Sequence, residues 1–215
     1  MKKKIIIISL ISVFTIATIL MLAQNRNEGQ VPAEQVNRSI QTFSRLLTPE
    51  TVKSFGVNSV EEFRNLRPGK QFRKYMIGLD DVRSFRPETQ VSSIIKQLNS
   101  TEVSLVNQSG QIQTGIEFIF RDGKWEPGAF GLSPDMARLK NAQRSLTDVQ
   151  IDTVLFITIP ALQTTFLMTG TGPAANFIVL ENNDRLQFRV GSRVPAAEAI
   201  RRLKVIADEY NGLPQ

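Results

Sequence analysis

The chemistry open to this chain is restricted first by the residue types that it lacks. The 215 residues include no histidine and no cysteine. Without imidazole, a Ser-His-Asp arrangement, histidine general bases and histidine metal sites are excluded. Without thiols, cysteine nucleophiles, disulfides and sulfur-ligated zinc are excluded as well. What is left is the chemistry of carboxylates, of serine paired with lysine, and of cations bound through oxygen.

Carboxylates are the most plausible of these groups, and three pairs are adjacent in sequence: Glu61-Glu62, Asp80-Asp81 and Asp208-Glu209. Adjacent side chains point apart on a helix or a strand, so these pairs do not form an acid–base dyad by themselves. Most other acids occupy predicted caps and turns, where a carboxylate accepts backbone amides. The acids left over, Glu102 and Glu117 among them, show no spacing that must bring two together. A catalytic pair would have to come from distant positions in the sequence. A carboxylate-dependent extracytoplasmic hydrolase that uses such a pair is an alternative function.

Three further motifs have simpler structural explanations. Ser93-Ile94-Ile95-Lys96 matches Ser-x-x-Lys, and a helix would place Lys96 one turn from Ser93, but the companion signatures of serine acyltransferases are absent. Gly170-Thr171-Gly172 is followed by Pro173 and a predicted strand, whereas a phosphate cradle needs a helix. Asn182-Asn183-Asp184 lacks the later ligands of a calcium loop. We therefore predict no catalytic residue, no metal site and no cofactor.

Residues 1–24 predict export from the cytoplasm. Lys2, Lys3 and Lys4 precede an uncharged run from Ile5 to Ala23, and positive flanks stay on the cytoplasmic side. As a helix rising about 1.5 Å per residue, the run spans about 28 Å, close to the hydrocarbon thickness of a bilayer. Two alternatives stay open: an uncleaved anchor crossing the membrane with residues 5–23, or a signal peptide cleaved after Ala23. Both predict an extracytoplasmic protein, either membrane-anchored or secreted to the periplasm or beyond.

The charge of the remaining chain is nearly balanced. The sequence has 26 basic and 20 acidic residues, and three of the basic ones are the N-terminal lysines, which leaves 23. The basic residues are scattered, whereas a nucleic-acid binder would cluster them or interleave them with aromatic residues, so we expect no nucleic acid as a partner. One basic run stands out, and it is either a solvated surface or a contact for an unknown macromolecule or an anionic surface. It consists of Arg64, Arg67, Lys70, Arg73 and Lys74.

The apolar pattern predicts an α+β fold. Helices are expected over residues 34–47, from a capping box at 59–62, over 91–98, from Pro134 to about 146, and from Pro195. Strands are expected over 71–77, 102–106, 112–120, from Trp125, and over 153–159, 162–168, 177–180 and 185–190. Tight turns at 107–110 and at Asp122-Gly123 would join neighbouring strands into antiparallel β-meanders.

The same pattern suggests how the chain is organised. We divide it into a signal peptide or signal anchor (1–24), a linker (25–35), a first α+β half (36–148) and a second α+β half (149–215). Each half has a strand pair with a polar turn, closed by a helix that begins at Pro134 or at Pro195. This predicts antiparallel meanders packed against helices, either as a duplicated unit or as one continuous antiparallel sheet with helices on one face.

One stretch resembles a known group of proteins. From Phe72 to Gly131 the chain has a strand, a short helix, a second strand and a hairpin that ends in Gly123-Lys124-Trp125. This order is similar to that of uncharacterised exported bacterial proteins with a Gly-Lys-Trp-type β-meander, although Val103 and Leu105 stand where those proteins carry tryptophan or tyrosine. The resemblance implies no activity.

Together these observations predict an exported or membrane-tethered, non-enzymatic envelope protein that binds a macromolecular partner or a ligand. Besides the hydrolase, a chaperone-like or structural envelope component is an alternative. The folded structure can distinguish the hydrolase from the binding protein. An acidic pair converging in a concave pocket would favour the hydrolase, and an exposed apolar groove would favour the binding protein.

Overall fold

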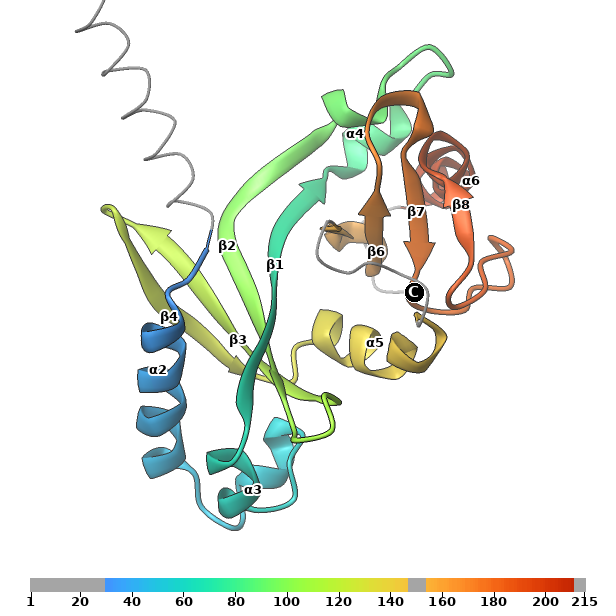
Figure 1. The fold of residues 1–215 in the computed structure, drawn as a ribbon. Coiled ribbons are helices and arrows are strands. Elements are labelled where there is room, and N and C mark those ends of the chain that lie inside the picture. The colour runs from blue at the N-terminus through green and yellow to red at the C-terminus, as the bar shows by residue number, and fades with distance from the viewer. Residues whose placement is uncertain (1–29, 147–153, 211–215) are drawn as a thin grey trace, which may run out of the picture.

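The computed structural model describes residues 30–146 and 154–210. The predicted signal or anchor lies outside these residues, as does the start of the predicted 153–159 strand. No helix within the described ranges is long and apolar enough to cross a membrane. The α+β prediction is confirmed, because helices flank one eight-stranded sheet with the order β4-β3-β2-β1-β5-β6-β7-β8 (Figure 1).

The first half of the fold consists of short helices followed by a β-meander. Its helical elements are α2 (Ala33–Leu46), η1 (Val52–Phe55), α3 (Val60–Arg64), α4 (Leu79–Arg83) and η2 (Val91–Ser93). Its strands are β1 (Arg67–Ile77), β2 (Ile95–Val106), β3 (Ile112–Arg121) and β4 (Lys124–Gly131). All four strands pair antiparallel with their neighbours in this half.

The second half of the fold begins with α5 (Pro134–Ala142), which continues into η3 (Gln143–Ser145). Its strands are β5 (Leu155–Ile159), β6 (Thr164–Thr169), β7 (Asn176–Val179) and β8 (Arg193–Pro195), with η5 (Pro160–Leu162) and η6 (Gly172–Ala174) between them and α6 (Ala196–Glu209) at the end. This meander is antiparallel too, but it joins the first through a parallel pairing of β1 with β5. The described chain thus forms a continuous sheet that is mixed rather than purely antiparallel.

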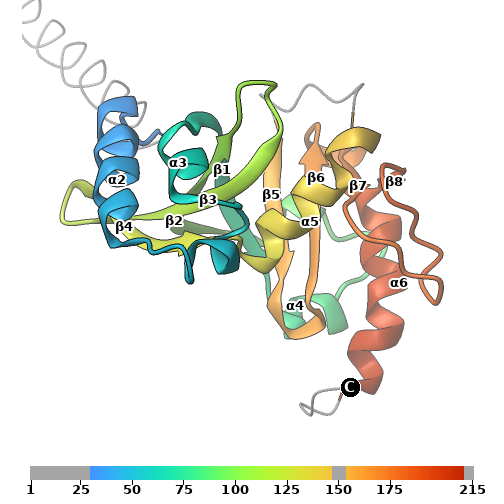
Figure 2. The ribbon, with the colours of Figure 1, turned by 90° about the horizontal axis from the view of Figure 1, so that it is seen from below.

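The two faces of the sheet are covered by different helices. One face packs against α5 through buried apolar side chains of β1, β5, β6 and β7: Phe72, Phe156, Leu167 and Ile178. Alternate strand residues point to the other face, where α2 and α3 cover the first half and α4 and α6 cover the second. Figure 2 shows α5 between α2 and α3 at one end and α6 at the other. Helices on both faces differ from the one-sided arrangement that we considered.

Two predicted elements are wrong. Residues 91–98 were expected to be a helix, but only Val91–Ser93 forms a single 3₁₀ turn, and β2 begins at Ile95. Pairing with β1 overrides the local apolar spacing there, so Lys96 is on a strand and not one helical turn from Ser93. Residues 185–190 were expected to be a strand, yet they turn back at Gln187, which has a φ of 55°, and form one isolated bridge.

Local capping and turn signals were more reliable. The Ser59 and Ser133 hydroxyls accept hydrogen bonds from the amides of Glu62 and Met136, each at 3.0 Å, and so cap α3 and α5 as predicted. Asp122 and Gly123 both adopt a positive φ, 49° and 76°, and form the tight turn between β3 and β4. These signals succeed because each depends on residues that are close in sequence.

Candidate functional site

A cluster of charged side chains lies on the sheet face covered by the start of α5. Lys74 Nζ of β1 is 3.1 Å from Glu117 Oε1 of β3, 3.8 Å from Glu102 Oε2 of β2 and 3.8 Å from Asp135 Oδ2 of α5. The side chains of Lys74 and Asp135 are 14% and 16% exposed, while Glu102 is only 2% exposed. We call Lys74, Glu102, Glu117 and Asp135 the α5 cluster.

The register of the sheet brings the two glutamates together. Glu102 and Glu117 are direct partners across β2 and β3, where like charges repel each other unless a cation lies between them. Lys74 supplies that cation. It falls at an irregularity in the β1–β2 pairing, between Arg73 and Tyr75, and its partner on the other side is Phe156 of β5. Lys74 therefore has an apolar residue beside it on β5, and its ammonium group lies within 4 Å of both glutamates.

The first turn of α5 completes the cluster. The Ser133 hydroxyl caps the helix and donates a hydrogen bond of 2.5 Å to Glu102 Oε1. The Thr165 hydroxyl of β6 donates to Asp135 Oδ1 at 2.6 Å, and Arg138 is 3.5 Å from the same oxygen. The positive end of the helix dipole also favours carboxylates at this position. One oxygen, Glu102 Oε2, is buried and accepts no hydrogen bond.

Burial and charge act in opposite directions on the two central groups. Burial raises the pKa of Glu102 above its ordinary value of 4.5, and the hydrogen bond from Ser133 and the charge of Lys74 only partly offset this. For Lys74, burial alone would lower the pKa, but attraction to Glu102, Glu117 and Asp135 more than compensates and raises it above 10.5. Lys74 therefore stays charged at neutral pH, whereas Glu102 holds a proton to a higher pH than an ordinary glutamate does.

A pocket of about 230 Å³ opens beside the α5 cluster. Its lining includes Lys74, Glu102 and Glu117, and also Phe55 and Phe130. Phe130 pairs with Ile116 and so lies towards the face opposite the glutamates, at the edge strand β4. The two rings are stacked, with centroids 4.7 Å apart and planes 12° apart, and we call them the aromatic wall.

Gly131 permits the close approach of the aromatic wall. It has a φ of 130°, and a Cβ atom there would lie 3.0 Å from Phe55 Cδ1. Phe130 also stacks on Phe43 of α2, at a centroid distance of 4.5 Å. The rings are thus fixed by packing from three separate elements, η1, β4 and α2.

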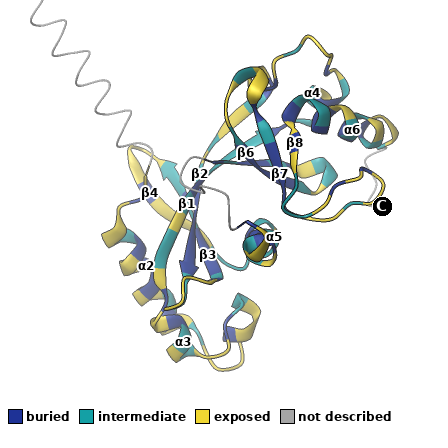
Figure 3. Cartoon of the chain, turned by 45° about the vertical axis from the view of Figure 1, so that its right-hand side comes forward, coloured by how far each residue is buried: buried dark blue, intermediate teal, exposed yellow. Residues whose placement is uncertain are grey.

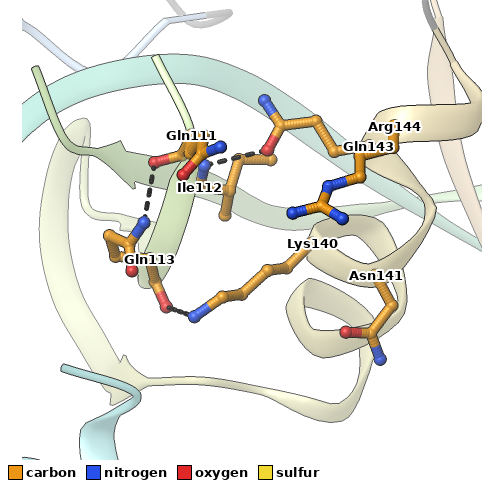
Figure 4. A pocket seen from close by; sticks show the side chains of 7 residues that line it. All are labelled: Gln111, Ile112, Gln113, Lys140, Asn141, Gln143 and Arg144. Carbon is orange, nitrogen blue, oxygen red and sulfur yellow. Dashed lines mark hydrogen bonds between the residues drawn. The ribbon is translucent and has the colours of Figure 1, made fainter. Parts of the chain in front are cut away.

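A larger pocket of about 590 Å³ lies farther along α5 and is lined by polar side chains (Figure 4). Gln143 accepts a hydrogen bond of 2.9 Å from the Ile112 amide, and Lys140 donates one of 3.1 Å to the Gln113 carbonyl. These bonds fasten α5 and η3 to β3. Lys140 and Gln143 thus have a structural role, and the lining of this pocket includes none of the α5 cluster.

The structure divides the predicted basic segment. Arg64, Arg67 and Lys70 are exposed along α3 and the start of β1, and Arg64 is 3.7 Å from Glu61. Arg73 is half-buried, and Lys74 points into the α5 cluster instead of towards a shared basic surface. A contact surface made by this segment stays a prediction, and the structure supports it best for the three exposed residues.

The predicted turn did not give the pairing of the two glutamates. That turn, at 107–110, is centred on Gln108-Ser109, and a regular hairpin centred there places Glu102 opposite Gly115. The structure pairs Glu102 with Glu117, because the β2–β3 register shifts between Leu105 and Val106. No sequence signal connects Lys74 or Asp135 to this pair either, because their contacts depend on how β1 and α5 pack.

No group of three acidic side chains that could hold a metal ion occurs in the described ranges. Comparisons with known proteins add no assignment: no protein-family model, no curated protein and no solved structure matches the chain. The proposed function therefore rests on the α5 cluster and its pocket.

Proposed function

We propose that this chain is an exported or membrane-tethered, non-enzymatic envelope protein that binds a ligand or macromolecular partner in the pocket beside the α5 cluster. The observation that carries the proposal is the pocket itself, whose lining includes two stacked aromatic rings and carboxylates already held by their neighbours. Preorganised polar groups in a partly apolar pocket are typical of binding sites. The export part of the proposal rests on the sequence of residues 1–24.

The burial of Glu102 supports binding over hydrolysis. A carboxylate pair that cleaves a glycosidic bond must place one carboxyl group on each side of that bond. Glu102 is 2% exposed and hydrogen-bonded to Ser133, so a substrate bond has little access to it. The Ser133 hydroxyl is also engaged, since it caps α5 and donates its proton to Glu102, and it is not directed to a base in the manner of a nucleophile.

A carboxylate-dependent hydrolase is the second candidate, and one observation favours it. Glu102 and Glu117 converge in a concave pocket, and the pKa of Glu102 is raised by burial, as expected of a general acid. This is the arrangement that would distinguish an enzyme from a binding protein if both carboxyl groups could reach a substrate. The accessibility of Glu102 is therefore the point to test.

The test compares turnover by the full chain with turnover by Glu117→Gln. Glu117 is the more exposed of the two glutamates, and the substitution keeps its shape but removes its charge. We expect no turnover of glycoside or peptide substrates above that of a heat-denatured control in either protein. Turnover by the full chain that falls about 100-fold or more in the variant, the order of loss expected of a general acid–base group, would replace this proposal with the hydrolase.

A further inference from the structure

We infer that the cavity between β3 and the helical run α5–η3 binds an oxyanion, a carboxylate or a phosphate carried by a small polar molecule (Figure 4). This cavity is separate from the pocket beside the α5 cluster, so its ligand would be additional to that of the proposed function. Three features of the cavity carry the inference: a lining with basic but no acidic side chains, a guanidinium group without an intramolecular partner, and an ammonium group positioned by uncharged carbonyls.

The first feature is the charge of the lining. The seven residues that line this cavity are Lys140, Arg144, Ile112 and four residues with amide side chains. No acidic residue of the described chain is among them. Positive charge in a cavity with low-dielectric walls raises the local concentration of anions. The lining therefore favours a negatively charged ligand.

The second feature is the guanidinium group of Arg144. Arg144 follows Lys140 by four residues on the run α5–η3, and both side chains are directed towards β3 (Figure 4). Like charges at this spacing repel each other, and an anion bound between them would remove the repulsion. The Arg144 side chain makes no hydrogen bond or ion pair with any described residue, so its five N–H donors are available. A planar guanidinium matches two oxygens of a carboxylate or a phosphate.

The third feature is the position of the Lys140 ammonium. Its Nζ atom donates hydrogen bonds to the carbonyls of Gln113, at 3.1 Å, and Gly56, at 3.4 Å. An ammonium group has three donors, so one is left for a ligand. Both carbonyls are uncharged, so they hold the ammonium in place without neutralising it. A ligand would meet a cation that is already ordered, which lowers the entropic cost of binding.

The size of the cavity limits the ligand to a small molecule. Its volume of about 590 Å³ is within the range of roughly 300–1,000 Å³ that small-molecule pockets occupy. The amide side chains of Gln111 and Gln113 on the β3 side suit hydroxyl groups, because an amide both donates and accepts hydrogen bonds. We therefore expect a sugar-sized molecule with hydroxyl groups and one anionic group.

The dipole of α5 offers a simpler explanation for the two cations. Lys140 and Arg144 lie in the last turns of α5 and η3, where the negative end of a helix dipole favours basic residues. That effect requires no ligand, and it predicts that an added anion does not bind in this cavity. A binding experiment therefore distinguishes the two explanations.

Calorimetric titration of the full chain in uncharged detergent micelles tests the inference. The probes are glucuronate, which carries a carboxylate, glucose 6-phosphate, which carries a phosphate, and glucose as their uncharged counterpart. We expect saturable binding of at least one anionic probe and none of glucose. The anion that binds more tightly identifies the group that the cavity prefers, and equal affinities would identify a general oxyanion site.

Variants of Arg144 test its role in binding. Arg144→Gln should weaken anion binding about 10- to 100-fold, the effect of losing a charge-assisted hydrogen bond. Arg144→Lys keeps the charge but not the planar fork, so it should recover only part of the affinity. Arg121→Gln is the matched control, because it removes the same charge from an exposed position at the end of β3, outside the cavity.

Three results would overturn the inference: no saturable binding of either anion, equal binding of glucose, or an equal loss of affinity in Arg144→Gln and Arg121→Gln. Each of them would leave the helix dipole as the explanation for Lys140 and Arg144. None of them bears on the proposed function, because its test depends on Glu117 in the other pocket.

Discussion

The strands in the two halves of the sheet present different kinds of side chain to α5. In the second half, β6 and β7 present Leu167 and Ile178 to α5, and their other face is apolar too. In the first half, β2 and β3 present Glu102 and Glu117 to α5, whereas Val103 and Ile116 point to an apolar core under α2 and α3. Figure 3 shows buried colours on β7 and exposed ones on β4. One helix thus covers a largely apolar surface in the second half, which we call the dry half, and a surface with two glutamates in the first, the charged half.

This difference assigns stability and the proposed binding to different halves of the sheet. The dry half removes apolar area from water on both faces, which is the dominant favourable term in folding. The first half places charged groups where apolar side chains would otherwise pack, and buried ion clusters of this kind are weak contributors to net stability. The charged half is therefore where we propose the binding site. The predictions below test this contrast, from the largest expected effect to the smallest.

The largest effect should come from Phe166 in the dry half. Its ring is 1% exposed, stacks on Phe177 at a centroid distance of 4.9 Å and meets Phe188 at 5.5 Å. Phe166→Ala should lower the free energy of unfolding by about 3–5 kcal/mol, the usual cost of an aromatic cavity. Urea denaturation measures this.

Phe118 is the counterpart of Phe166 in the apolar core of the first half. Phe118 is fully buried there, Trp125 of the same core is 9% exposed, and Phe120 is partly buried against them. We expect Phe118→Ala to cost about 3–5 kcal/mol as well. A loss below about 1 kcal/mol at either position would contradict the assignment of both cores.

The next effect should come from Lys74, on the charged surface. Lys74→Met leaves Glu102 and Glu117 facing each other without their cation, and breaking a buried pair in this way costs about 3–5 kcal/mol at pH 7. Lys124→Met is the control, since Lys124 is exposed at the β3–β4 turn, and it should change stability by less than about 0.5 kcal/mol.

The cost of Lys74→Met should depend on pH. The folded-state pKa of Lys74 is raised, so its stabilising effect is fully present below 10.5 and is lost as pH rises through the folded-state value. The cost should also shrink in acid, because Glu102, whose pKa is raised, takes up a proton and no longer needs the cation. A cost that is the same at pH 4 and at pH 7 would indicate that Lys74 acts through packing alone.

A smaller effect is expected from Glu102→Gln, and its sign follows from the raised pKa. The folded protein binds the Glu102 proton more tightly than the unfolded chain does, so ionisation destabilises the fold as pH rises above 4.5. The variant removes that cost. Its unfolding free energy relative to the parent should therefore increase from pH 4.5 to pH 8 in urea denaturation, whereas Glu126→Gln should show no such trend. A decrease would mean that attraction to Lys74 outweighs burial.

The smallest effect on stability, and a distinct effect on attachment, should come from Arg64 and Arg67. Both are exposed, so reversing them to glutamate should change the unfolding free energy by less than about 0.5 kcal/mol each. If they contact anionic lipid, vesicle sedimentation should show a loss of about 1 kcal/mol of binding energy per basic residue removed. The control is Arg121→Glu with Arg144→Glu, which alters the net charge equally at other exposed positions. Equal losses in both double variants would exclude a specific basic surface. Lys74 is left unchanged because it belongs to the α5 cluster.

The sequence by itself determined the available chemistry and the local structure. Without histidine and cysteine, only carboxylates, lysines and hydroxyls could build a site. The caps at Ser59 and Ser133, the Asp122-Gly123 turn and the helix after Pro195 were predictable, because each depends on contacts within a few residues. The pairing of Glu102 with Glu117 was not predictable in this way, because it depends on a register shift between Leu105 and Val106.

Only the tertiary structure decided what surrounds that pair. Lys74 reaches it because β1 lies between β2 and β5, a parallel neighbour that comes about 80 residues later in the chain. Ser133 and Asp135 reach it because α5 crosses the sheet at that point. The periodicity of a segment says which residues share a face, but not which strand lies beside it or which helix covers it. The same limit explains the failure at 91–98, where pairing with β1 outweighed helical spacing.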